Sequence, residues 1–399
     1  MKLISACSIL LLCSNIVFAK QFKVVDRDKK FKTVIKKQYL TDLTSKTSFE
    51  GKYFKIVEAT SNQAISFDSK EKLKLKAATV YYHLTKARSY FVNKLESDFI
   101  KNYSQITIRL NLTNKFNDLG KFANVKNDPQ FNNAVTIPSG KGFASRGVEP
   151  WQSEIWFRPS KIINVKELGG YDQQSREVKS MLYSFRKSTH MMTFRRFLTN
   201  LILGDYGNLG NETLVSSLFR TAGSSFIIET AYQTTGIVAS KLSRQQYSLE
   251  AALVPEIIYH EFSHLVLSDE IDINTSTPLN EGMADYFAGK IAESEALGLK
   301  SKYNLFSGKE VDRDQLYKSR LESSDYANAD FVFGLLWQID EELGNNNDKF
   351  IFNLRKNIDA NGTIRDDLVN SIMATCRANC KNPLTDSYSL YLLFDKKGL

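Results

Sequence analysis

Apolar and polar residues follow two different periods along this chain of 399 residues. From 106 to 112 every second residue is apolar, which predicts a strand with one buried face, and 153–157 predicts a further short strand. From 71 to 99, from 177 to 203 and after 281, apolar residues recur at the spacing of a helix. The apolar positions of the first helix are Ala77, Val80, Tyr81, Leu84, Phe91 and Leu95. This mixture predicts an α+β fold.

An apolar run from 254 to 267 contains two histidines at the spacing of one helical turn, in the sequence H-E-F-S-H. Because His260 and His264 would share one face of a helix, both imidazoles can bind one metal ion. Glu261 projects beside that ion, where it can polarise a bound water. The alternative is a pair of buried histidines with a structural role. With only four histidines in the chain, an accidental match is rare.

The sequence N-E-G-M-A-D at 280–285 offers a third ligand. Glu281 follows His264 by 281 − 264 = 17 positions, which leaves room for a turn and a second, antiparallel helix. Asp285 shares the face of Glu281 and can accept a hydrogen bond from the far nitrogen of a ligating histidine. The alternatives are a first-turn glutamate favoured by the helix dipole and a solvated helical aspartate.

H-E-x-x-H followed by N-E-G-x-A-D resembles the gluzincin metallopeptidases, and the spacing of four between Glu281 and Asp285 resembles their thermolysin-like branch. The gap of 17 is slightly shorter than is usual in that branch. The resemblance implies a zincin-like, two-lobed fold, with a mixed sheet in the N-terminal lobe and a helical C-terminal lobe. The helix that carries the histidines would lie at the cleft between them. One zinc ion would be held by His260, His264 and Glu281, with water at the fourth position.

The resemblance extends to three other segments. Residues 78–91 resemble the first long helix of thermolysin-like catalytic domains. Asn133 and Ala134 resemble the edge-strand pair that holds the substrate backbone, although such a pair is also common in turns. Tyr326 takes the position of the histidine in the family's H-x-N-S-G stretch, and no histidine follows His264 in this chain. The phenol would then stabilise the oxyanion, and a packed aromatic is the alternative.

The resemblance implies zinc-dependent hydrolysis of a peptide bond in a polypeptide substrate. Glu261 would take a proton from the attacking water and pass it to the leaving amine. Two other hypotheses stand beside this one. The first is a catalytically inactive zinc-binding module that serves recognition, for which an intact general base would be unnecessary. The second is a structural envelope protein in which the motif is accidental.

The first 19 residues have the pattern of a secretory signal peptide, with Lys2, an apolar run from 3 to 12, and Ala19 at the cleavage site. No later stretch reaches about 18 uninterrupted apolar residues, so we expect an exported protein, periplasmic or secreted, without a transmembrane anchor. Cleavage leaves Cys376 and Cys380 as the only thiols. An oxidising compartment favours a disulfide between them, and zinc binding by the pair is the alternative.

The excess of basic residues, +9 over the whole chain, is densest from 20 to 37, where eight Lys and Arg face two Asp. We expect strands or a loosely held extension over 20–65, with its most basic part, 20–37, a solvated arm attracted to anionic surfaces. An N-terminal α+β lobe over 66–249 would follow, with a helical insertion at about 171–249, and then a helical lobe over 250–399. The insertion is either scaffold or a cover for the cleft. We expect structural roles for His83 and His190, a monomer, and no nucleic-acid partner.

Overall fold

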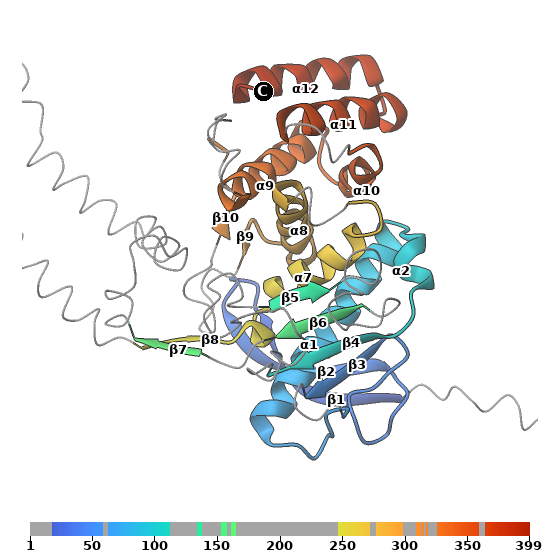
Figure 1. Ribbon diagram of the computed structural model, residues 1–399, viewed down its shortest axis with the longest axis vertical. Helices are drawn as coiled ribbons and strands as arrows, with labels where there is room; N and C mark the ends of the chain where they lie inside the picture. The colour runs from blue at the N-terminus through green and yellow to red at the C-terminus, as the bar shows by residue number, and fades with distance from the viewer. Residues whose placement is uncertain are drawn as a thin grey trace, which may run out of the picture. The chain divides into compact units, whose positions relative to one another are not determined.

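The computed structural model describes most of the chain outside its first residues and a long central stretch. The described residues are 18–58, 63–111, 134–137, 153–157, 161–164, 246–271, 277–297, 309–311, 313–314, 317, 325–358 and 364–399. They form a mixed α+β structure with small sheets (Figure 1), as the sequence predicts. Among these residues, no helix has both the length and the apolar content that a membrane crossing requires.

The chain divides into two compact units. Unit 1 comprises Met1–Ser160, Glu250–Asn304 and Gly308–Leu399, and unit 2 comprises Lys161–Leu249 and Leu305–Ser307. The described part of unit 2 is one antiparallel pair, β7 (Lys161–Asn164) with β8 (Gln246–Leu249). The predicted insertion, with His190, lies otherwise outside the described residues. All the features below belong to unit 1.

Unit 1 begins with an antiparallel hairpin of β1 (Phe18–Arg27) and β2 (Thr33–Leu43). One face of this hairpin is buried, including Phe22 and Val24, so residues 18–43 are part of the core and not the solvated arm that their charge predicts. The hairpin packs against α1 (Glu71–Ser89). There, the N–H of Val25 donates a hydrogen bond of 3.0 Å to Thr79 Oγ1. Helix α1 therefore covers polar backbone groups of β1 that would otherwise be exposed at a sheet edge.

A four-stranded sheet follows in the order β3-β4-β6-β5. Strands β3 (Phe54–Glu58), β4 (Ile106–Leu110) and β6 (Glu154–Phe157) run parallel, and β5 (Ala134–Ile137) runs antiparallel at the edge. The strands expected at 106–112 and 153–157 are thus present. Helix α1 continues into the π-helical segment η1 (Tyr90–Lys94), which is followed by α2 (Asp98–Asn102). The predicted helix over 71–99 therefore changes from α-helical to π-helical geometry at Tyr90 and ends at Lys94, about one turn early.

The rest of unit 1 is helical, apart from the short pair β9 (Ala296–Leu297) and β10 (Lys309–Glu310). Its helical elements are η5 (Ala251–Leu253), α7 (Pro255–Leu267), α8 (Thr277–Ala292), α9 (Asp325–Glu342), α10 (Asp348–Asn353), η7 (Leu354–Asn357), α11 (Ile364–Asn379) and α12 (Pro383–Lys397). Helices α11 and α12 pack against each other, and the structure joins Cys376 and Cys380 in a disulfide at the turn between them.

A cluster of buried aromatic rings fixes α7 between the sheet and α8. The ring of Phe262 on α7 lies 6.0 Å from that of Phe54 on β3 and 5.9 Å from that of Phe91 on η1, measured between centroids. Phe91 in turn lies 5.4 Å from Phe287 on α8. All four side chains are buried. Such contacts stabilise the packing beyond the burial of apolar area, so α7 has a defined position against both neighbours.

His83 is a structural histidine, as expected. Its Nδ1 lies 2.6 Å from the hydroxyl of Tyr259 on α7, and its Nε2 lies 2.8 Å from the carbonyl oxygen of Val25 on β1. Burial lowers the pKa of His83 to about 4, so the ring is neutral at physiological pH. The imidazole links the hairpin, α1 and the helix of the histidine pair in one hydrogen-bonded chain.

A buried ion pair also joins the hairpin to α7. Arg27 donates two hydrogen bonds, of 2.7 and 2.9 Å, to the carboxylate of Glu256 in the first turn of the helix. The two side chains are 8% and 3% exposed, so each charge depends on the other for its stabilisation. The start of α7 is thereby held by a strand that lies 229 positions away in sequence.

Arg27→Ala should lower the free energy of unfolding by about 3–5 kcal/mol, because it leaves the Glu256 carboxylate buried without its cation. The measurement is denaturant-induced unfolding. A control on the same hairpin is Lys36→Ala, whose pair with Asp26 is partly exposed and should cost at most about 1 kcal/mol. Equal effects of the two variants would show that the Arg27 pair does not hold the hairpin to α7.

Candidate functional site

Helix α7 carries three of the predicted site residues: His260, Glu261 and His264. Pro255 occupies its first turn, where a missing N–H costs nothing, and apolar residues bury most of its surface. The helix ends at Leu267, and the N–H of Ser268 still donates to the carbonyl of His264 at 3.0 Å. His260 and His264 therefore lie on regular helix, one turn apart on the same face.

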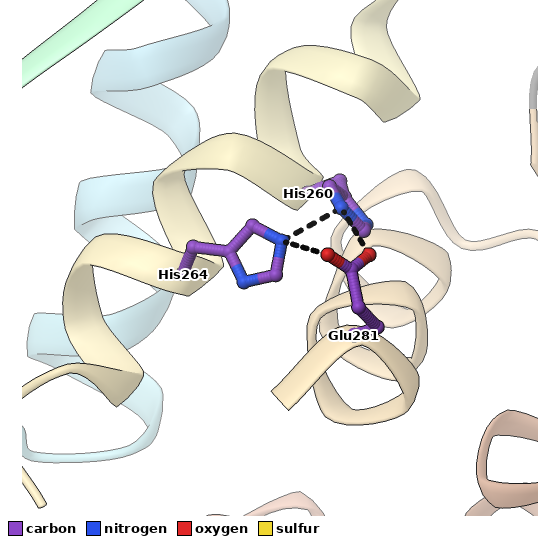
Figure 2. A group of neighbouring side chains, drawn as sticks. All are labelled: His260, His264 and Glu281. Atoms are coloured by element: carbon purple, nitrogen blue, oxygen red, sulfur yellow. Dashed lines mark hydrogen bonds and ion pairs between the residues drawn. The ribbon is translucent and has the colours of Figure 1, made fainter. Parts of the chain in front are cut away.

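Helix α8 packs against α7 and brings Glu281 to the two histidines (Figure 2). Glu281 Oε2 lies 3.3 Å from His260 Nε2, and Oε1 lies 3.6 Å from His264 Nε2. The two Nε2 atoms are 2.8 Å apart. Each of the three residues thus offers one candidate ligand atom, and these three atoms all lie within 4.8 Å of one another. The structure brings together the three residues that the sequence predicts as metal ligands.

Two further residues of α8 hold the far nitrogens of the imidazoles. His260 Nδ1 lies 2.8 Å from Asp285 Oδ1, and His264 Nδ1 lies 3.1 Å from Asn280 Oδ1. A carboxylate or amide oxygen only accepts a hydrogen bond, so each Nδ1 carries a proton. In the neutral imidazole, Nε2 is then the atom with a free lone pair. Asp285 makes the contact predicted for it, whereas the sequence analysis missed the role of Asn280.

Burial and the neighbouring carboxylates shift the pKa of His260 in opposite directions. Burial by itself would lower the pKa of His260, but Asp285 and Glu281 raise it to about 10. Without a metal ion, His260 is therefore a cation that partly neutralises the two carboxylates. A cation that binds at Nε2 must displace this proton, so metal binding should release protons and tighten as the pH rises.

The group of side chains fits a zinc ion. Two imidazole nitrogens and one carboxylate oxygen form a donor set used by catalytic zinc sites, which keep a fourth position for water. Bonds of about 2.0–2.2 Å to a tetrahedral ion place the ligand atoms roughly 3.4 Å apart. The separations of 3.3 and 3.6 Å to the Glu281 oxygens agree with this spacing. The histidine nitrogens at 2.8 Å are closer and would separate slightly around an ion.

Glu261 lies beside the triad and is 6% exposed. Burial raises the pKa of its carboxyl group, while the charges of His260 and His264 and a hydrogen bond from Thr136 lower it. Its carboxylate interacts electrostatically with His260, His264 and Glu281, so it lies near these three residues. It is not one of the atoms that converge as candidate metal ligands. This is the arrangement that a general base beside a metal requires.

Thr136 on the edge strand β5 contacts Glu261 directly. Its Oγ1 lies 2.9 Å from Glu261 Oε2 and 2.6 Å from the carbonyl oxygen of Glu261. The Thr136 side chain is buried, so no water competes freely for these contacts. The sequence analysis placed the edge-strand function at Asn133 and Ala134. The only sequence signal for Thr136 is its spacing of two from Ala134, which puts both on one side of the strand.

The structure describes the other predicted site residues, Asn133, Ala134 and Tyr326, only in part. Ala134 begins β5, whereas Asn133 lies outside the described residues. Tyr326 belongs to the first turn of α9, but its side chain is not among those described. Helix α9 approaches α8 closely at Gly282, where a Cβ atom would lie 2.5 Å from the Val332 side chain. The glycine after Glu281 is thus explained by the packing of α9.

Comparisons with known proteins do not identify the chain. No family model matches it, and a search of curated proteins also finds no match. The assignment of the site therefore depends on the geometry of its own residues.

Asp285→Ala and Asn280→Ala should each weaken zinc affinity by about 10–100-fold, because each releases one histidine ring from its orientation. The measurement is competition with a coloured chelator. Glu293→Ala, at the exposed residue that follows α8, is the control and should leave the affinity unchanged. An effect below twofold in both site variants would show that α8 does not orient the histidines.

Proposed function

We propose that this protein is a zinc-dependent peptidase of the gluzincin type, with one zinc ion per chain. The observation that carries the proposal is the convergence of His260, His264 and Glu281, with each Nδ1 held by α8 and Glu261 next to the group. A zinc ion held by these three residues supplies a Lewis acid and lowers the pKa of water at its open position. A site with only a structural ion would have no use for the adjacent carboxylate.

Glu261 acts as the general base in this proposal. Its carboxylate accepts a proton from the attacking water and later donates it to the leaving amine, so no covalent bond to the enzyme forms. Burial raises the pKa of Glu261, and a zinc ion beside it would act in the opposite direction and favour the carboxylate that accepts a proton. Thr136 holds one carboxylate oxygen, which limits the rotation of the side chain.

We further propose that the polypeptide substrate lies along β5, within a two-lobed arrangement of the zincin kind. Two observations support this. Strand β5 has β6 on one side and no other strand among the described residues on its free edge, so an extended peptide can add there by backbone hydrogen bonds. Thr136 joins the same strand to Glu261, which places the edge next to the proposed base. Backbone contacts from Asn133 and Ala134, and stabilisation of the oxyanion by Tyr326, remain predictions.

Export from the cytoplasm is part of the same proposal. The disulfide between Cys376 and Cys380 supports an oxidising compartment. The pattern of the first 19 residues is that of a signal peptide.

Glu261→Gln should keep its zinc and fold but lose hydrolysis of a denatured protein by a factor on the order of 10²–10⁴, because it removes only the base. Bound zinc and the rate of cleavage are measured on the same samples. His264→Ala is the complementary variant and should lose the metal as well. Full activity in Glu261→Gln would exclude the mechanism, and a wild-type protein that binds zinc but cleaves no peptide library would exclude the function.

Thr136→Val should lower kcat by about 10–100-fold, the effect of losing a hydrogen bond to a charged group, with little change in KM or zinc content. Thr136→Ser, which keeps the hydroxyl, should retain most of the activity. If valine and serine had equal effects, the side chain would act through packing and not through its hydrogen bond.

A further inference from the structure

The turn between β1 and β2 contains a phenylalanine in a conformation that bulky residues rarely adopt. Phe31 has φ +58°, in the left-handed region that favours glycine or asparagine. Asp28 holds the turn, because its Oδ1 accepts hydrogen bonds from the N–H groups of Lys30 at 2.8 Å and Lys32 at 2.9 Å. The Phe31 side chain is 37% exposed, so burial in the core does not account for its presence. The turn itself requires a left-handed residue here, since the Phe31 N–H donates to the Asp28 carbonyl at 2.9 Å and the Asp28 N–H to the Lys32 carbonyl at 3.0 Å. It does not require a large aromatic side chain, because glycine or asparagine would adopt this conformation at lower cost, which leaves the exposed ring to be explained by a function.

The hairpin around this turn carries an excess of positive charge. Its exposed lysines are Lys20, Lys23, Lys29, Lys30, Lys32 and Lys37. From 19 to 41, all of it described, the two carboxylates are those of Asp26 and Asp28, and both are partly exposed. Asp26 is paired with Lys36 at 3.1 Å, and Asp28 accepts hydrogen bonds from the backbone of the turn. An anionic partner would therefore meet more lysines than acidic side chains, and both carboxylates already have partners.

Apolar side chains are interleaved with these lysines on the outer face of β2. Ile35 is 50% exposed and Tyr39 is 64% exposed, and Lys37 lies between them on the same side of the strand. Lys23 of β1 stands directly opposite Lys37 in the register of the hairpin. Two like charges in this relation destabilise a strand pair, and an anion over them removes the repulsion.

We propose that this surface, formed by Phe31, Ile35, Tyr39 and the exposed lysines other than Lys20 and here called the hairpin surface, docks the protein on a membrane of anionic phospholipid. Lys20 is left out because its ammonium lies over the rings of the core residues Phe22 and Phe67. Lysines near such a membrane are attracted by the headgroups, while the aromatic and aliphatic side chains enter the interfacial region. A nucleic acid would also attract the lysines, and its bases could stack on Phe31 and Tyr39. We favour a membrane because Ile35, 50% exposed, adds an aliphatic side chain that the interfacial region of a bilayer accommodates and base stacking does not use. The docking does not depend on the proposed peptidase activity.

Contacts of β1 with neighbouring helices provide the rigidity that docking needs. Arg27 and the His83 contact fix β1 to α7 and α1, so the hairpin surface is mounted on the core. A docked hairpin would therefore hold unit 1 at the membrane without a spanning helix.

The test is co-sedimentation of the purified protein with vesicles of phosphatidylcholine, with and without phosphatidylglycerol. We expect binding only to the anionic vesicles, weakening as salt is raised. Phe31→Asn should lower the vesicle affinity about tenfold without lowering the melting temperature, because asparagine accepts the backbone of the turn. Binding to both vesicle types alike, or to neither, would overturn the proposal.

The lysines are tested with a matched pair of triple variants. Changing Lys29, Lys30 and Lys32 to Gln should weaken binding on the order of 100-fold, at about 1 kcal/mol for each lysine near the surface. Changing three exposed lysines outside the hairpin to Gln should keep binding within about threefold of wild type. These controls are Lys70, Lys101 and Lys381. Equal losses of vesicle affinity in the two triple variants would show that binding depends on the net charge of the protein and not on the hairpin surface, and would overturn the proposal.

Competition with heparin separates a lipid surface from a general polyanion site. In our proposal heparin competes for the lysines but binds more weakly than the anionic vesicles, since it makes no use of Phe31, and Phe31→Asn lowers the affinity for vesicles alone. If heparin bound as tightly as the anionic vesicles and Phe31→Asn changed neither affinity, the hairpin surface would recognise polyanions and not membranes.

Discussion

The hydrogen bonds from His260 Nδ1 to Asp285 and from His264 Nδ1 to Asn280 are the interactions on which the candidate site depends. They place a proton on each Nδ1 and orient the rings so that both Nε2 atoms point to the Glu281 carboxylate. Because the two acceptors and Glu281 all belong to α8, the register of one helix against another sets the whole group of candidate ligands. The same register requires a residue without a side chain at 282, where α9 approaches.

Helix α7 packs into the core on one side and contacts the sheet edge through Glu261 on another. On one side Phe262 enters the aromatic cluster with Phe54 and Phe91, which fixes the helix against the sheet and η1. The residue just before it, Glu261, meets Thr136 at the sheet edge. A shift of α7 would therefore disturb the core and the proposed base together. This coupling explains how a buried carboxylate can be kept at a fixed place beside the histidine pair.

The N-terminal hairpin shows how one strand pair can combine stability with recognition. It contributes apolar residues to the core and, through Arg27, one buried ion pair to the start of α7. Elsewhere it keeps lysines, two aromatic rings and an isoleucine in solvent. The turn accounts for the backbone conformation of Phe31, and the proposed docking accounts for the presence of an aromatic ring there.

The sequence by itself determined the local elements of this protein. The period of the helix converts the spacing of four between His260 and His264, and of four between Glu281 and Asp285, into shared helix faces, so the group of candidate ligands was predictable. Alternation of apolar residues likewise predicted β4. Contacts between distant segments were not predictable, because no periodicity fixes which side chain meets which across a packed core. Thr136 reaches Glu261 over 125 positions and Arg27 reaches Glu256 over 229, and only tertiary packing decided those partners.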